Sequence, residues 1–148
     1  MSLTNVFDIA GSGMNAQSIR INTTASNIAN AESASSSVDE TYRARKPWFA
    51  VMEKAFTDVN EKNQFDEIEG GIGAGVQVMG IVEKDAPLQM RFQPDHPMAN
   101  EDGYVYYPNV NIVEEMTDMM SSSRSYQMNV EVLKTAKQML QRTLALGE

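Results

Sequence analysis

Apolar residues recur at alternating steps of four and three positions near both ends of this 148-residue chain. Such spacing places side chains along one side of an α-helix, and a series that persists over several turns is typical of helices that pack together. The N-terminal series is Leu3, Phe7, Ala10, Met14, Ile21 and Ile28. The C-terminal series is Ile112, Met116, Met119, Tyr126, Val130, Leu133, Leu140 and Leu144. We therefore expect two long helices.

The N-terminal series predicts a helix of about 28 residues, with Ser2 as a suitable N-cap. Asn30, a residue type that tolerates a left-handed backbone, is a suitable end. Gly11 and Gly13 each weaken such a helix by about 1 kcal/mol relative to alanine. We therefore expect contacts from outside the helix to stabilise it.

The C-terminal helix is predicted to start after Pro108, because Asn111 and Glu114 have the spacing of a capping box. A second apolar row lies beside the first and consists of Val132, Ala136, Met139 and Leu146. This apolar side is wider than one partner helix covers, so we expect more than one neighbour. The methionines of this helix suit a core and an adaptable subunit interface equally well.

Between the helices the pattern changes to short apolar runs bounded by Gly, Pro and Asp, which are typical of β-strands. The runs are Pro47–Met52, Gly75–Val82 and Gly103–Tyr107. Residues 32–40 and 57–75 have the composition of mobile loops, and two prolines fix a turn at Gln93–Pro97.

The predicted fold is α+β, with long N- and C-terminal helices pairing as an antiparallel coiled-coil-like layer and a small β-rich insert domain between them. The predicted divisions are residues 1–31 for an N-terminal assembly helix, 32–109 for the insert and 110–148 for a C-terminal assembly helix.

The net charge of −8 argues against a nucleic-acid partner and an anionic membrane surface, since both require a concentrated basic face. No apolar run approaches the roughly 20 residues that span a bilayer. The N-terminus lacks the basic and apolar regions of a secretory signal peptide. We expect no nucleic-acid partner, no direct membrane insertion and no cleaved signal.

No motif indicates catalysis, a metal or a cofactor. The chain has no cysteine, which excludes thiolate catalysis and disulfides. Gly70–Gly75 matches neither phosphate-loop pattern, and Lys62 occupies a ligand position of the calcium-loop-like stretch that begins at Asp58. His96 lies between two prolines and is interpreted as a turn residue. We therefore expect no catalytic residue, metal or cofactor.

Residues 21–31 carry small, uncharged polar side chains around the whole circumference of the predicted helix. A solvated helix surface normally carries Lys and Glu, and a core normally carries large apolar groups. Such a segment is typical of a helix with close neighbours on several sides, to which Ser, Thr and Asn form hydrogen bonds. One chain of this length cannot cover two long helices completely, so we expect copies or related chains to do so.

Three blocks of the sequence resemble rod proteins of the bacterial flagellar basal body. The first and third are similar to axial rod and hook proteins generally, and the second is similar to proximal-rod proteins. The blocks are Phe7–Met14 with Asn22–Ala31, then Pro94–Pro97 with Asn100–Val105 and Pro108–Val110, and finally Ser123–Lys137.

The resemblance implies a structural subunit that stacks helically into a torque-transmitting tube through the periplasm. It implies copies of itself and other flagellar rod proteins as partners, and export through the flagellar type III apparatus without a cleaved signal.

On this interpretation the assembly interface combines apolar rows of both helices with a few polar residues. The apolar members are Leu3, Phe7, Met14, Ile21, Ile28, Met116, Met119, Tyr126, Val130, Leu133 and Leu140. The polar members are Asn27, Asn30, Arg124 and Asn129. The alternative function is a periplasmic glycan hydrolase using acids from Asp95 to Asp102, since glycosidic cleavage requires two carboxyl groups at a controlled separation.

Overall fold

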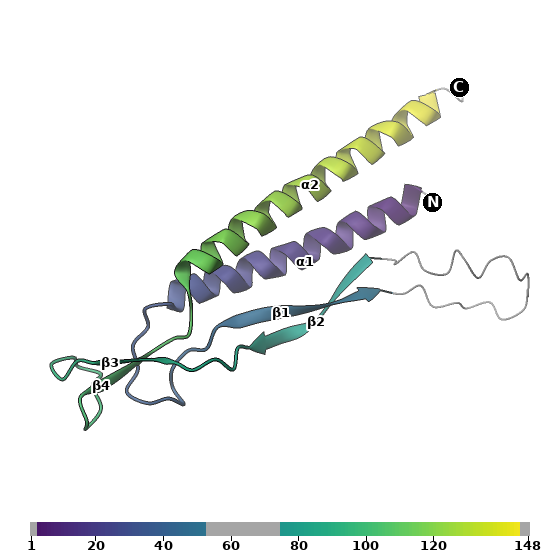
Figure 1. Cartoon of the computed structure of the whole chain (residues 1–148). Coiled ribbons are helices and arrows are strands. Elements are labelled where there is room, and N and C mark those ends of the chain that lie inside the picture. The colour runs from purple at the N-terminus through teal and green to yellow at the C-terminus, as the bar shows by residue number, and fades with distance from the viewer. Residues whose placement is uncertain (1–2, 53–74, 146–148) are drawn as a thin grey trace, which may run out of the picture.

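The structure, a computed structural model, describes residues 3–52 and 75–145. Helix α1 spans Leu3–Asn30 and helix α2 spans Ile112–Ala145. The two helices pack side by side and run antiparallel, so the start of α1 and the end of α2 lie at the same end of the pair (Figure 1). Within the described residues, four strands lie between the helices in the sequence, which confirms the predicted α+β arrangement.

Helix α1 ends at the predicted residue by a different means. The Asn30 side-chain amide donates a hydrogen bond to the Ser26 carbonyl at 2.8 Å. No non-glycine residue in the described part has a positive φ, so the expected left-handed Asn30 is wrong. The side chain instead bonds back to a carbonyl four residues earlier, in the last turn of the helix. Ser2, the expected N-cap, lies outside the described residues.

Helix α2 begins with half of the expected capping box. The Asn111 Oδ1 atom accepts a hydrogen bond from the Val113 N–H at 3.2 Å, as an N-cap does. The Glu114 side chain does not accept the hydrogen bond from the Asn111 N–H that completes a capping box. Its carboxylate binds the Lys46 ammonium at 3.3 Å instead. Neither described helix is both long and apolar enough to cross a bilayer.

The described part of the insert contains two separate antiparallel ribbons. Strand β1 (Arg45–Met52) pairs with β2 (Gly75–Glu83), and β3 (Gln89–Phe92) pairs with β4 (Tyr104–Tyr107). Three of these strands fall on predicted runs. Strand β3 was not predicted, because Phe92 is its only strong strand former, whereas β4 has the same length but consists of tyrosine and valine.

The serine-rich loop at residues 32–40 is attached to the second ribbon, because Ser35 forms an isolated bridge with Tyr106 of β4. The turn at Gln93–Pro97 is confirmed by its backbone geometry. The predicted loop from residue 57, the calcium-loop-like stretch and the glycine run up to residue 74 lie outside the described residues.

The β1–β2 ribbon lies along α1 (Figure 1). The Ser12 hydroxyl accepts a hydrogen bond from the Val76 N–H at 3.1 Å and donates one to the Ile9 carbonyl at 2.9 Å. Gly75 has a φ of 134° and lies so close to Ser12 that a side chain has no room. This contact fixes the start of β2 against the helix.

Small side chains dominate the interior. The buried apolar residues of the described part are Ala10, Ala16, Ala31, Ala44, Val105, Val110 and Ala136. No leucine, isoleucine, methionine or aromatic residue in that part is buried. One cluster of Ala31, Ala44 and Val110, with Tyr42 and Ile112 partly buried against it, lies where the helices meet the insert. The core of one chain is therefore small.

Candidate functional site

The two helices meet through a row of small and polar residues on α2. Glu115, Ser122 and Ala136 are buried, and Asn129 completes the seven-residue spacing as a partly buried member. A Cβ atom added to Gly13 of α1 would lie 2.9 Å from Asn129 Nδ2. Gly13 thus lies where the helices approach closely, which is the outside contact expected to offset its low helix propensity.

The predicted interface residues of α2 divide between this row and the surface. Met119, Asn129 and Leu133 are partly buried. The exposed members are Met116, Arg124, Tyr126, Val130 and Leu140. The residue that follows Ile112 in the helix contact can be three or four positions later, at Glu115 or Met116. The sequence pattern predicts Met116, because it is apolar. The structure places Glu115 against α1 instead, so Met116 faces solvent.

On α1 the predicted residues from Phe7 to Asn30 line the covered side. Phe7, Met14, Ile21, Ile28 and Asn30 are partly buried, Asn27 is fully buried, and Leu3 is the first residue of the helix. Whether these residues and those of α2 form an interface between subunits stays a prediction.

The uncharged segment at residues 21–31 is covered partly by its own chain. Thr23, Thr24 and Asn27 are buried within one copy, so the chain itself covers part of the circumference. Among residues 5–30 of α1, the exposed positions are Asp8, Asn15, Asn22, Ala25 and Ala29. A Cβ added to Gly11 meets no atom within 4 Å. The uncovered side of α1 therefore consists of small residues with one charge.

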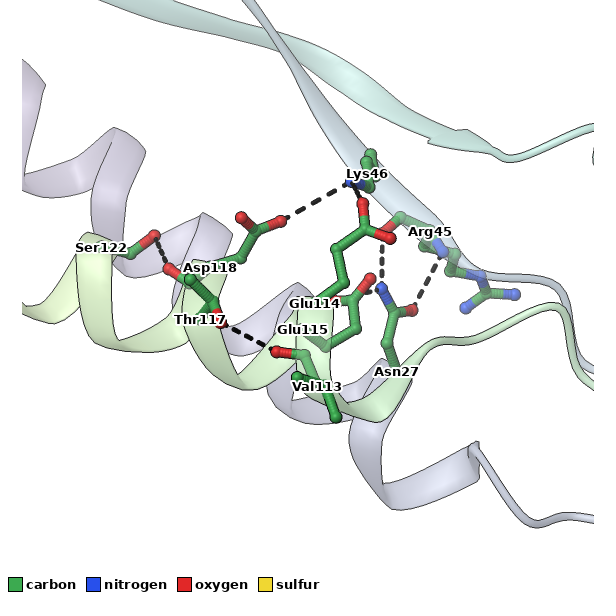
Figure 2. A network of polar contacts seen from close by, with 9 residues as sticks. All are labelled: Asn27, Arg45, Lys46, Val113, Glu114, Glu115, Thr117, Asp118 and Ser122. Carbon is green, nitrogen blue, oxygen red and sulfur yellow. Dashed lines mark hydrogen bonds and ion pairs between the residues drawn. The ribbon is translucent and has the colours of Figure 1, made fainter.

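Asn27 joins three segments of the chain at the end of the helix pair (Figure 2). Its Nδ2 donates to the Arg45 carbonyl at 2.8 Å and to Glu115 Oε2 at 3.0 Å. Its Oδ1 accepts from the Arg45 N–H at 2.9 Å and from the Tyr42 hydroxyl at 2.9 Å. An amide side chain offers two donor and two acceptor positions, so the hydrogen-bonding capacity of Asn27 is fully used.

A cluster of charges lies beside this amide (Figure 2). The Lys46 ammonium is 3.3 Å from Glu114 Oε1 and 3.6 Å from Asp118 Oδ2. Burial alone lowers the pKa of Lys46, but the bond to Glu114 and the charges of Asp118 and Glu115 outweigh it and raise the pKa. The first strand of the insert is thereby held to the first turns of α2.

Asn109 also connects separate segments of the chain, a role that the sequence analysis did not predict. Its Oδ1 accepts the Ala44 N–H at 2.8 Å, and its Nδ2 donates to the carbonyls of Lys84 at 3.0 Å and Ala86 at 2.9 Å. Asn27 and Asn109 both bind backbone groups of neighbouring segments. Their common signal in the sequence is an asparagine among apolar or small residues close to a predicted helix end.

The acids of the alternative hydrolase hypothesis lie in the segment that connects β3 to β4. Asp95, Glu101 and Asp102 are all exposed. The His96 Nδ1 atom accepts the Met98 N–H at 3.1 Å inside its turn, which confirms His96 as a turn residue.

Comparisons with known proteins match these helices. The profile described as "Flagella basal body rod protein" matches residues 7–32, and that of "Flagellar basal body rod FlgEFG protein C-terminal" matches residues 101–146. Flagellar basal-body rod protein FlgC of Salmonella typhimurium and that of Yersinia enterocolitica are each 43% identical to this chain over 148 residues, covering 100% of both sequences. The Borreliella burgdorferi FlgC is 36% identical over 155 residues, covering 99% of this chain and 98% of its own. The chain belongs to the flagellar basal-body rod protein family.

The segments matched by the rod-family profiles contain the helix pair. Residues 7–32 include most of α1 with Gly13 and Asn27, and residues 101–146 include β4 and all of α2. Both partners of the close approach between Gly13 and Asn129 thus lie within matched segments, as do both partners of the Asn27 to Glu115 bond. The resemblance to flagellar rod proteins is confirmed.

Proposed function

We propose that this rod-family chain is a structural subunit that polymerises into the proximal rod and transmits torque across the periplasm. The observation that carries the proposal is the exposure of large apolar side chains on α2. Val113, Met116, Met120, Met128 and Leu144 are between 50% and 73% exposed in one chain. Fully burying one such side chain contributes about 1.5–3 kcal/mol, so a partner over this helix gains substantial stability.

The proposed lateral interface joins unlike surfaces of neighbouring copies. The uncovered side of α1 is small and nearly uncharged, so a second helix can approach it closely. The uncovered side of α2 carries methionines, whose flexible side chains fill irregular gaps. Two different surfaces of one chain form a heterologous contact, which repeats into an open helical assembly when the rotation does not close.

The divisions 1–31, 32–109 and 110–148 keep their roles in this proposal. Of the predicted assembly residues, the exposed ones on α2 contact neighbouring subunits, and those on the covered side of α1 hold the helix pair together within one chain. The two terminal helices form the assembly layer and the insert lies outside it. The partners are copies of this chain, other flagellar rod proteins and the type III export apparatus. The location is the periplasmic rod of the basal body, reached without a cleaved signal. The role is mechanical and includes no catalytic step or cofactor.

Substitution of an exposed methionine tests this proposal. Met120→Asp places a charge on the uncovered side of α2, so we expect cells with this variant to lack complete rods and to be non-motile. Lys84→Asp changes an exposed residue of the insert and is the matched control, with normal motility expected. Equal helix content of both purified variants by circular dichroism separates failed assembly from failed folding. Normal motility with Met120→Asp would contradict the proposed interface.

A further inference from the structure

We propose that Met116 and Met120 of α2 form an oxidation-sensitive site: a peroxide converts their thioethers to sulfoxides in the free chain, and the oxidised chain is excluded from the rod. This inference rests on the proposed rod function and adds a means of regulating the same surface of α2.

Methionine provides all the sulfur of this chain. The sequence has 11 methionines and no cysteine, so no thiol of its own competes for an oxidant. Among the described residues Met120 is the most exposed methionine, at 67%, and Met116 is 50% exposed. Met14 and Met119 are partly buried. Because the thioether lies near the end of the side chain, exposure of this size gives small oxidants in the solvent access to the sulfur.

The two methionines lie on the surface that the proposed function assigns to a neighbouring subunit. They are four positions apart in α2, so their side chains lie on the same side of the helix. Val113, which is 73% exposed, precedes Met116 by three positions and extends the same row. The buried side of α2 carries Glu115 and Ser122 instead. Met116 and Met120 are therefore accessible before assembly, and a neighbouring subunit covers them after it.

The oxidation is a two-electron transfer of one oxygen atom from a peroxide. A lone pair of the thioether sulfur attacks one peroxide oxygen, the O–O bond breaks and an S–O bond forms. The sulfur is oxidised, and the other peroxide oxygen takes up a proton and leaves as water when the oxidant is hydrogen peroxide. A methionine sulfoxide reductase reverses the change, because it removes the oxygen as water while two of its thiols are oxidised to a disulfide.

A sulfoxide changes the contact that these side chains can make. The thioether is apolar and flexible, which suits burial against an irregular surface. The sulfoxide is polar, so burying it under a neighbouring helix without a hydrogen-bond donor is unfavourable. Two sulfoxides on adjacent turns of α2 oppose the same contact. The oxidised chain therefore assembles less readily than the unmodified chain.

The insert provides an internal control. Met79 of β2 and Met90 of β3 are 61% and 58% exposed, so a small oxidant reaches them as readily as it reaches α2. The proposed function places the insert outside the assembly layer. Oxidation of Met79 and Met90 should therefore leave assembly unchanged.

The distribution of sulfoxides between free and assembled chains is the first measurement. Flagellated cells that produce the full chain receive hydrogen peroxide while new basal bodies form, and mass spectrometry gives the sulfoxide fraction at each methionine. We expect the fraction at Met120 to be at least about tenfold lower in basal bodies than in the unassembled chain, and that at Met90 to agree within about twofold. Equal fractions at Met120 in the two pools overturn the inference. So does an unassembled chain that is oxidised at Met90 but not at Met120.

Replacement of the sulfur separates exclusion of oxidised chains from protection after assembly. Met116→Leu with Met120→Leu keeps the apolar volume and removes the oxidisable atoms, and Met79→Leu with Met90→Leu is the matched control. Each variant is produced together with the unmodified chain in the same cells, so damage to other proteins affects both equally.

The ratio of variant to unmodified chain in basal bodies is the second measurement. A peroxide dose that oxidises most of Met120 in the unassembled chain should raise this ratio about tenfold for the α2 variant and change it less than about twofold for the control. A constant ratio for the α2 variant, or an equal rise for both variants, overturns the inference. Absence of the unmodified chain from untreated basal bodies would refute the proposed rod function itself, and this inference with it.

Discussion

Removal of the Asn27 side chain is the sharpest test of how the helices hold the insert. Asn27→Ala deletes four hydrogen bonds at a completely buried position. It leaves the Arg45 peptide N–H and carbonyl, the Tyr42 hydroxyl and the Glu115 carboxylate without that partner. The substitution also leaves a void the size of an amide between α1, α2 and the first strand of the insert.

The expected cost follows from these unpaired groups. A buried polar group without a partner costs about 1–3 kcal/mol, and water that enters the void recovers part of this. We expect Asn27→Ala to lower the free energy of unfolding by about 3–4 kcal/mol. Asn30→Ala, which removes one bond to the Ser26 carbonyl, should cost about 1 kcal/mol and is the matched control. A domain with so small a core has little stability in reserve.

Urea unfolding followed by circular dichroism measures both variants. We expect the midpoint of Asn27→Ala to fall well below that of Asn30→Ala, with the insert detaching from the helices. Equal midpoints for the two variants would refute the role of Asn27 in holding the insert to the two helices.

Three further outcomes follow from the structure. Gly11→Ala should stabilise the isolated chain by about 0.5–1 kcal/mol in thermal unfolding, because its Cβ enters open space, and Gly13→Ala should gain less because its Cβ meets Asn129. The pKa of Lys46 is raised in the folded chain, so its stabilising contribution is complete below the pKa of an unfolded lysine and is lost as pH rises through the raised value. Urea midpoints between about pH 9 and 12 should therefore fall less in Lys46→Gln than in the unmodified chain. Zymography on peptidoglycan should show no clearing by the purified chain or by Asp95→Asn, and clearing that Asp95→Asn abolishes would restore the hydrolase hypothesis.

Local periodicity was sufficient to predict the two helices, and their antiparallel pairing followed from their places at opposite ends of the chain with a compact insert between them. The spacing from Leu3 to Ile28 predicts α1 well because helix formation depends on neighbours three and four positions away. Local periodicity could not decide whether Glu115 or Met116 contacts α1. That choice depends on Asn27, a residue 88 positions away from Glu115, and no local pattern contains that information.

The roles of Asn27 and Asn109 could be predicted only in part. Asn27 stands out because the segment around it carries no charge, and the structure confirms that it is surrounded. Its partners Tyr42 and Arg45 belong to the insert, whereas the sequence pattern suggested other subunits. Asn109 also lies close to a predicted helix end, but its role could not be predicted because the backbone carbonyls it binds come together only when the insert folds.

Accessibility of α2 in the assembled flagellum tests the central claim most directly. Met120→Cys and Lys84→Cys give single labelling sites in a chain that has no other cysteine, and both residues are exposed in one copy. We expect a maleimide to label both variants equally as isolated chains. In purified basal bodies we expect Met120→Cys to react at least about tenfold more slowly than Lys84→Cys, because a neighbouring subunit buries the apolar side of α2. Equal labelling of the two sites in basal bodies would contradict the account.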